Sequence, residues 1–230
     1  MARIILIGGG SSSGKSFITR RVIENLGAEN VTRLTLDDYY KDQTDMPFEE
    51  RCLVNYDHPK AFDWPLMRRQ IAMLKENKTI RKPIYDFVAH TRSEKNEDIA
   101  PKGIVIVEGI MALVDEDLRK KADLRIFIEA SSERRFLRRM IRDSKERGRS
   151  FESIVNQYVS TVQPMYDEIV EPSSIYADLI VNNDGVENLA VEVLTCLLRE
   201  QIALAKADQQ NGQDKNDEFS EEVLSQVFGK

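Results

Sequence analysis

A glycine- and serine-rich segment near the N-terminus has the residue types and spacing of a phosphate-binding loop. Its sequence, Gly9-Gly10-Ser11-Ser12-Ser13-Gly14-Lys15-Ser16, fits the pattern Gly-x-x-x-x-Gly-Lys-Ser/Thr. Glycines let successive backbone N–H groups surround phosphate oxygens, and the helix that follows directs its positive N-terminal end at them. We expect these residues to bind a nucleotide, with Lys15 reaching the β and γ phosphates and the Ser16 hydroxyl binding Mg²⁺.

Two carboxylates follow predicted strands and could act beside this loop. The apolar run Ile104–Val107 delivers Glu108 to the carboxyl edge of the sheet, where we expect it to organise Mg²⁺ together with Ser16. Asp37 follows the predicted strand Val31–Leu36, and a carboxylate in that place can orient an acceptor hydroxyl and accept its proton. Asp37 is therefore the expected catalytic base.

An arginine-rich span, residues 133–149, holds seven arginines and one lysine against three acidic residues. Phe136, Leu137, Met140 and Ile141 form an apolar stripe at helical spacing, which places the arginines on other faces of the helix. A solvated surface helix would account for some of these arginines. A lid over a triphosphate would instead use their guanidinium groups to stabilise the transferring phosphoryl group and to exclude water.

Short apolar runs alternate with helical patterns, as in a doubly wound α/β fold. The predicted strands are Ile4–Ile7, Val31–Leu36, Ile104–Val107, Leu124–Ile128 and Leu179–Val181. The predicted helices are Lys15–Leu26, Pro65–Glu76, Ser132–Glu146 and Val186–Lys206. We expect one domain over residues 1–206, with a parallel sheet and flanking helices, a substrate-binding excursion at about 37–100 and a lid at about 133–150. Residues 207–230 are polar and predict a flexible tail, in which Phe219–Phe228 could form a short amphipathic helix.

Composition limits the class of protein. A net charge of −6 over 230 residues excludes a generally basic nucleic-acid binder. The chain has two cysteines, Cys52 and Cys196, so a disulfide framework is excluded. The N-terminal apolar run Ile4–Ile7 is too short for an export signal, and no apolar stretch approaches the length that spans a bilayer. We expect a soluble, cytoplasmic protein with no membrane or nucleic-acid partner.

Phosphate-loop proteins include GTPases, motor ATPases and small-molecule kinases, so the loop alone names no function. The sequence has no Asn-Lys-x-Asp or Thr-Lys-x-Asp motif for reading guanine, which argues against a GTPase. Asp37 and the polar segment after it provide an acceptor site and favour a kinase. Both histidines, His58 and His90, fall in that segment, close to tyrosines that could hydrogen-bond a planar base.

Several further blocks occur in a specific order. They are Asp-Asp-Tyr-Tyr-Lys-Asp-Gln, Asn-Tyr-Asp-His-Pro, Pro-Ile-Tyr-Asp-Phe-Val-Ala-His-Thr-Arg, Val-Glu-Gly-Ile, Arg-Arg-Met-Ile-Arg-Asp-Ser-Lys-Glu-Arg-Gly-Arg and Val-Gln-Pro-Met-Tyr. Together with the phosphate loop, from Ile4 to about Ile202, they resemble the uridine kinase (uridine-cytidine kinase) family of P-loop kinases, and Tyr-Lys-Asp-Gln is most like its bacterial branch.

The resemblance implies roles for particular residues. Asp37 matches the family's base, Asp57 the residue that holds the ribose hydroxyls, and Tyr85 with His90 the pair that reads the pyrimidine 4-position. The other expected substrate-binding residues are Tyr40, Tyr56, Phe87, Arg139, Arg149 and Gln157, while Arg142 and Arg147 match lid arginines near the phosphates. The family also implies a small β-hairpin insert and a homotetramer.

The implied activity is Mg²⁺-dependent transfer of the γ-phosphoryl group of ATP or GTP to the 5′-hydroxyl of uridine or cytidine, giving UMP or CMP in pyrimidine salvage. One alternative is a related kinase of another alcohol, such as phosphoribulokinase or pantothenate kinase, which would not need Tyr85 and His90. A second alternative is a catalytically silent nucleotide-binding regulator.

The sequence departs from the family at two places. Asn182-Asn183-Asp184 stands where the family usually has Pro-Arg-Gly, so a basic residue near the expected site of the donor base is missing. Glu129 replaces the more common Asp. The first departure bears on the strength and selectivity of donor binding.

Overall fold

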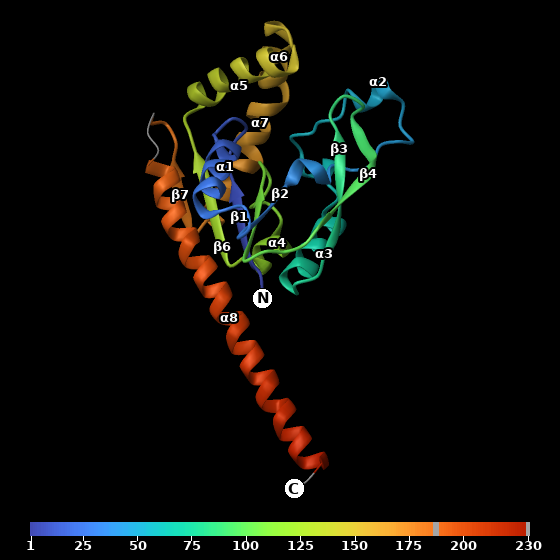
Figure 1. Ribbon diagram of the computed structural model, residues 1–230. Helices are drawn as coiled ribbons and strands as arrows, with labels where there is room; N and C mark the ends of the chain where they lie inside the picture. The colour runs from blue at the N-terminus through green and yellow to red at the C-terminus, as the bar shows by residue number, and fades with distance from the viewer. Residues whose placement is uncertain (186–188, 229–230) are drawn as a thin grey trace.

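A computed structural model describes residues 1–185 and 189–228, with side chains as far as residue 208. Figure 1 shows a sheet wrapped by helices, a separate hairpin and a long C-terminal helix. The strands are β1 Arg3–Gly8, β2 Val31–Thr35, β3 Ile80–Asp86, β4 Thr91–Ile99, β5 Ile104–Glu108, β6 Leu124–Glu129 and β7 Leu179–Asn182. The α-helices are α1 Lys15–Leu26, α2 Phe48–Arg51, α3 Trp64–Lys75, α4 Glu116–Lys121, α5 Ser132–Arg147, α6 Phe151–Gln157, α7 Gln163–Met165 and α8 Leu189–Phe228.

The central sheet is parallel and has the strand order β2-β5-β1-β6-β7. Its central strands are buried on both faces: Ile4, Ile5, Leu6 and Ile7 of β1 are at most 1% exposed. Such continuous apolar runs, without polar alternation, are what a sheet covered on both sides requires. The doubly wound fold predicted from the sequence is confirmed, and its carboxyl edge carries the loops after β1, β2 and β5.

Each face of the sheet packs against a different set of helices. On one face, Ile5, Ile7 and Ile106 form a core with side chains of α1 and α8. On the other face, Leu6, Val105 and Val107 pack with residues of α3, of the segment after β2 and of the hairpin. The two clusters hold the phosphate loop between the end of β1 and the start of α1.

The polar excursion predicted at about 37–100 contains a hairpin of its own. Strands β3 and β4 pair antiparallel in a two-stranded sheet beside α3, as the family resemblance implied (Figure 1). The turn between them places His90 at φ 51°, and the Asp86 carboxylate stabilises it by accepting hydrogen bonds from the backbone of Val88 and Ala89. Tyr40 and Phe62 form a short antiparallel bridge that ties the segment after β2 to the start of α3.

The apolar stripe noted in the arginine-rich helix is not the buried face of that helix. The buried residues of α5 are Arg135, Arg139 and Asp143, at 2%, 5% and 0% exposed, whereas Leu137 and Ile141 are 60% and 58% exposed. These three buried residues recur every fourth position and so share one helix face. The hydrophobic periodicity misled because this face packs over the phosphate loop and α6, where charged groups find partners, and not over the apolar core.

The C-terminal region also differs from the prediction. Helix α8 runs unbroken from Leu189 to Phe228 and passes through the segment expected to be a flexible linker. Its first half packs on the sheet through Leu194, Leu198 and Ile202, and the rest extends beyond the body of the molecule (Figure 1). Once packing has formed the first turns, adding further turns costs little, which explains the continuation. The predicted start of this helix, Val186, lies outside the described residues.

No helix among the described residues combines the length and the apolar character needed to cross a bilayer.

Candidate active site

The phosphate loop connects the end of β1 to the start of α1. It leaves β1 at Gly9, whose φ of +137° and contact with the Ile128 carbonyl leave no room for a side chain. The Lys15 ammonium is 6% exposed and donates to the carbonyls of Gly9 and Gly10 at 2.8 and 2.7 Å. Burial lowers the pKa of Lys15 to about 8, against the opposing charges of Glu108 and Asp37. Lys15 is thus folded over the loop as a weakly solvated cation.

Two loop hydroxyls have no partner. Ser12 Oγ and Ser13 Oγ are buried and make no hydrogen bond within the described part of the chain. Buried polar groups normally find partners, because an unpaired one costs free energy. Unpaired hydroxyls, a buried ammonium and the start of α1 together form a site that suits phosphate oxygens.

The two predicted metal-binding residues lie in direct contact. The Ser16 hydroxyl donates to Glu108 Oε2 at 2.9 Å, and Glu108 is 2% exposed. The other carboxylate oxygen accepts from Arg33 Nε at 2.7 Å, an ion pair across β2 and β5 that was not predicted from the sequence. A hydroxyl and a carboxylate suit Mg²⁺, which uses one or two protein oxygens and takes its other ligands from phosphates and water. The residues present therefore fit the metal.

Asp37 lies in the short 3₁₀ turn Leu36–Tyr39 directly after β2. Burial raises the pKa of Asp37 to about 6; Lys15 opposes this rise, and the charges of Glu108 and Asp57 add to it. Thr35 at the end of β2 pairs with Glu108 at the end of β5, so the predicted base follows β2 at the same sheet edge as the predicted metal-binding carboxylate. A carboxylate with a pKa near 6 is poised to accept a proton at neutral pH.

The aromatic residues predicted to surround a base form one cluster between the hairpin and the segment after β2. The Tyr56 ring lies 5.1 Å from Tyr40 and 5.5 Å from His90 between ring centroids. Tyr85 packs against Tyr40 at 5.1 Å and against Phe87 at 5.2 Å. Tyr56 also lies 6.1 Å from Tyr85, so its ring connects Tyr85 with His90.

Tyr85 has the clearest unmet hydrogen-bonding capacity in this cluster. The side chain is 5% exposed, yet its hydroxyl makes no well-formed hydrogen bond to a described residue. Burial, followed by the neighbouring Tyr56, raises the pKa of the Tyr85 phenol, so it stays protonated and can donate. Phe87 is 54% exposed at the hairpin turn.

The predicted nucleoside-binding arginines meet at Gln157, the last residue of α6. Arg139 donates to Gln157 Oε1 at 2.7 Å and to the Ser11 hydroxyl at 2.8 Å, which joins the arginine-rich helix α5 to the phosphate loop. Arg149 also donates to Gln157 Oε1. The charge of Arg139, followed by that of Arg142, opposes a burial-driven rise in the pKa of Asp57. The arginine cluster and Asp57 are thus neighbours.

Asp143 gathers four arginines and was not assigned a role from the sequence. Its carboxylate contacts Arg139, Arg142, Arg147 and Arg149. The sequence signal was a single acid inside an arginine-rich run, four residues after Arg139. The two predicted lid arginines, Arg142 and Arg147, are held at this carboxylate.

The unusual segment after β7 contacts the phosphate loop. Asn183 Nδ2 donates to the Ser13 carbonyl at 2.8 Å, and the Asn183 carbonyl accepts from Arg138 at 2.9 Å. Asp184 accepts from the backbone N–H and the hydroxyl of Ser131 at 2.8 and 3.0 Å. Residues that depart from the family pattern therefore support the outer side of the loop.

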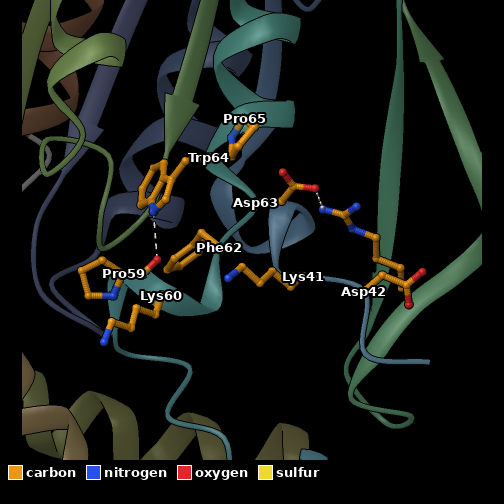
Figure 2. A pocket seen from close by; sticks show the side chains of 9 residues that line it. Lys41, Asp42, Pro59, Lys60, Phe62, Asp63, Trp64 and Pro65 are labelled. Atoms are coloured by element: carbon orange, nitrogen blue, oxygen red, sulfur yellow. Dashed lines mark hydrogen bonds and ion pairs between the residues drawn. The ribbon is translucent and has the colours of Figure 1, made fainter. Parts of the chain in front are cut away.

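A separate open cavity of about 720 Å³ is lined by none of the predicted site residues. Figure 2 shows Phe62, Trp64 and Lys41 around it. Its wall includes Arg92, which bonds the Asp63 carboxylate at 3.1 Å and the Tyr40 carbonyl at 2.9 Å. These contacts of Arg92 hold the backbone of Tyr40 in place.

Comparisons with known proteins place this architecture in a family. Residues 4–190 match the model of the phosphoribulokinase / uridine kinase family. A protein named uridine kinase from Deinococcus deserti is 45% identical over 86% of this chain and 96% of its own. One with the same name from Ligilactobacillus salivarius is 46% identical over 86% of this chain and 92% of its own.

A solved structure supports the fold at lower identity. Phosphoribulokinase from Rhodobacter sphaeroides superposes with a TM-score of 0.60 at 16% identity, covering 79% of this chain and 70% of its own. The family match extends over the phosphate loop, the hairpin and the arginine-rich helix. The chain belongs to the phosphoribulokinase / uridine kinase family.

Proposed function

We propose that this chain is a uridine/cytidine kinase, which transfers the γ-phosphoryl group of ATP or GTP to the 5′-hydroxyl of uridine or cytidine. The observation that carries the proposal is the position of Asp37, which follows β2 at the sheet edge where Glu108 ends the neighbouring strand β5 and contacts Ser16 of the phosphate loop. A base in that place adjoins both the donor phosphates and the ribose. The products would be UMP and CMP, as in pyrimidine salvage.

The donor side uses the phosphate loop and the lid. Loop N–H groups and the Ser12 and Ser13 hydroxyls bind phosphate oxygens, and Lys15 exchanges its carbonyl partners for the β and γ phosphates. Ser16 and Glu108 would hold Mg²⁺, which neutralises charge on the β- and γ-phosphoryl oxygens. Arg142 and Arg147 stabilise the charge that the transferring group carries in the transition state.

The acceptor side orients the nucleoside. Asp57 accepts hydrogen bonds from the ribose hydroxyls, while Arg139, Arg149 and Gln157 hold the nucleoside from the lid side. Asp37 accepts the proton of the 5′-hydroxyl as the hydroxyl oxygen attacks the γ-phosphorus. The bond between that phosphorus and the oxygen of the departing nucleoside diphosphate breaks.

The base would lie in the aromatic cluster. Tyr40, Tyr56 and Phe87 flank its faces. Tyr85 and His90 bond its edge, and the free Tyr85 hydroxyl supports this assignment because a bound base would give it a partner. A tyrosine hydroxyl can donate to a carbonyl or accept from an amino group, which suits both uridine and cytidine.

The proposal extends to the setting of the enzyme. A cytoplasmic homotetramer is proposed on the family resemblance, and sedimentation or mass photometry of the purified full chain tests the assembly. A monomer at micromolar concentration would contradict the tetramer and leave the activity proposal unaffected.

Release of ADP measures the activity directly. The full chain with ATP and Mg²⁺ is mixed separately with uridine, cytidine, adenosine, pantothenate and ribulose 5-phosphate. Uridine or cytidine should accelerate ADP release. Acceleration by a non-nucleoside alone would replace the proposal with another kinase of the family, and no acceleration by any acceptor would favour a silent nucleotide-binding regulator.

A further inference from the structure

The buried face of α5 is organised around one carboxylate. Asp143 is 0% exposed, and each of its oxygens faces a different pair of arginines. Oδ1 accepts from Arg142 Nε at 2.8 Å and lies 3.5 Å from Arg147 Nη1. Oδ2 lies 3.5 Å from Arg139 Nε and 3.8 Å from Arg149 Nη1. One carboxyl group therefore contacts both the predicted phosphate-facing pair and the predicted nucleoside-facing pair.

The charges in this cluster do not balance. Four guanidinium groups surround one carboxylate, and they outweigh its burial to hold the pKa of Asp143 below its ordinary value. Asp143 Oδ2 and Arg139 Nε have no hydrogen-bond partner within the described chain. Mutual repulsion would drive the arginines apart if the carboxylate lost its charge. The remaining positive charge is available to an anionic ligand.

The two arginine pairs are not equally constrained. Arg139 and Arg149 have a second common partner, Gln157 Oε1, and Arg139 also reaches Ser11 of the phosphate loop. No side-chain partner other than Asp143 occurs among the described residues for Arg142 and Arg147. Asp143 is thus the one described group that connects the two pairs.

We propose that Asp143 is a positioning residue that holds Arg142 and Arg147 for the donor phosphates and Arg139 and Arg149 for the nucleoside in one preorganised cluster. The inference rests on the proposed function for the identity of the two ligands. Asp143 itself touches neither ligand; it acts through the four arginines, and removal of its charge affects the donor and acceptor sites together.

The test is the isosteric variant Asp143→Asn, which removes the charge but keeps the shape. Its control is Glu146→Gln, the same loss of one charge at an exposed position of the same helix. Calorimetry measures the Kd of uridine, and separately that of a non-hydrolysable ATP analogue with Mg²⁺, for the full chain. In Asp143→Asn both Kd values should rise about tenfold, because each ligand loses fixed charged donors. Glu146→Gln should leave both within twofold of the wild type.

Steady-state kinetics adds a second readout. A merely structural role would lower the amount of folded protein and leave the KM values unchanged. Positioning of the arginines predicts instead that KM for uridine and KM for ATP both rise while kcat falls. A folded Asp143→Asn protein with unchanged affinities would overturn the inference, as would a loss confined to one ligand.

Repulsion among the arginines could unfold Asp143→Asn. In that case we compare the affinities of the double variant Asp143→Asn/Arg147→Gln with those of Arg147→Gln alone. The Arg147 substitution removes one of the repelling arginines, which is half-exposed. The double variant should bind both ligands more weakly than the single one, and equal affinities would overturn the inference. A wild-type protein that binds the ATP analogue but no uridine would contradict the proposed function. The Kd of the ATP analogue for wild type and Asp143→Asn would then decide the role of Asp143.

Discussion

At the residue scale, Asp37 combines its proposed catalytic role with a cost to folding. The pKa of its carboxyl rises from 3.8 to about 6 on folding, chiefly through burial. A raised pKa means that the folded state binds the proton more tightly than the unfolded state does. Protonation of Asp37 therefore stabilises the folded state fully below about pH 4, and this stabilisation is lost as the pH rises through 6. At neutral pH the ionised carboxylate is therefore a destabilising group kept for function.

Asp37→Asn should separate the two effects. We expect turnover to fall by at least about a hundredfold, while the free energy of unfolding at pH 7.5 rises by up to about 3 kcal/mol. Urea denaturation at pH 7.5 and pH 4 checks the sign, because the gain should disappear at the lower pH. A variant with near-normal turnover would remove Asp37 from its assigned role.

Tyr85→Phe tests base recognition. Removing a hydroxyl that makes no well-formed hydrogen bond to a described residue should leave stability almost unchanged and raise KM for uridine and cytidine about tenfold. Tyr39→Phe is the matched control, since its buried hydroxyl donates to Gln70 Oε1 at 2.7 Å. Tyr39→Phe should lose about 1 kcal/mol of stability and keep normal KM values. Normal KM values in Tyr85→Phe, with raised KM values in Tyr39→Phe, would refute the role of Tyr85.

At the element scale, the segment after β7 should affect the donor and not the acceptor. Asn183 supports the phosphate loop through the Ser13 carbonyl, so Asn183→Ala should raise KM for ATP about threefold to tenfold. KM for uridine should stay constant. Asn25→Ala is the control, because that side chain bonds Thr195 on the covering helices. An unchanged KM for ATP would show that the loop holds its shape without Asn183.

The sequence predicts some elements better than others for physical reasons. Strand runs such as Ile4–Ile7 are identifiable because a sheet covered on both faces requires continuous apolar segments. The loop residues Gly9 to Ser16 are identifiable because backbone phosphate binding requires them at fixed spacing. The orientation of α5 could not be identified from the sequence, since hydrophobic periodicity assumes an apolar partner and this helix covers a charged site.

Contacts made by residues far apart in the sequence are also hidden from periodicity. Arg33 reaches Glu108 across two strands, and Asn183 reaches Ser13 across 170 positions. Neither Arg33 nor Asn183 belongs to a local motif that would reveal its partner. Asp143 was visible only as an acid among arginines. Three of its contacts lie within about one helical turn, and only the fourth, with Arg149, requires the chain after Gly148 to turn back toward the helix.

At the scale of the whole molecule, the overall charge of −6 conceals a positively charged site. Three arginines of α5, together with Arg149 after it, are gathered at Asp143, and Arg139 links them to Ser11 of the phosphate loop, while acidic residues are spread over the rest of the chain. This arrangement attracts a small anionic ligand without making the whole surface basic.

Truncation after Lys206 tests how much of α8 the enzyme needs. The packed residues Leu194, Leu198 and Ile202 stay, and the exposed ion pair between Arg3 and Asp208 at 3.4 Å is lost. The free energy of unfolding should change by less than about 1 kcal/mol, with ADP release unchanged. A loss of activity or a change in oligomer mass would assign a role to the projecting half of the helix.

The central claim is phosphoryl transfer to a pyrimidine nucleoside at its 5′ position. Phosphorus NMR of the product formed from ATP, Mg²⁺ and uridine tests it most directly, with the Asp37→Asn protein as the control. We predict that the wild-type chain forms 5′-UMP as the phosphorylated product and that the variant forms almost none. Absence of 5′-UMP from the wild-type reaction, or a phosphate on the 2′- or 3′-oxygen, would contradict the account.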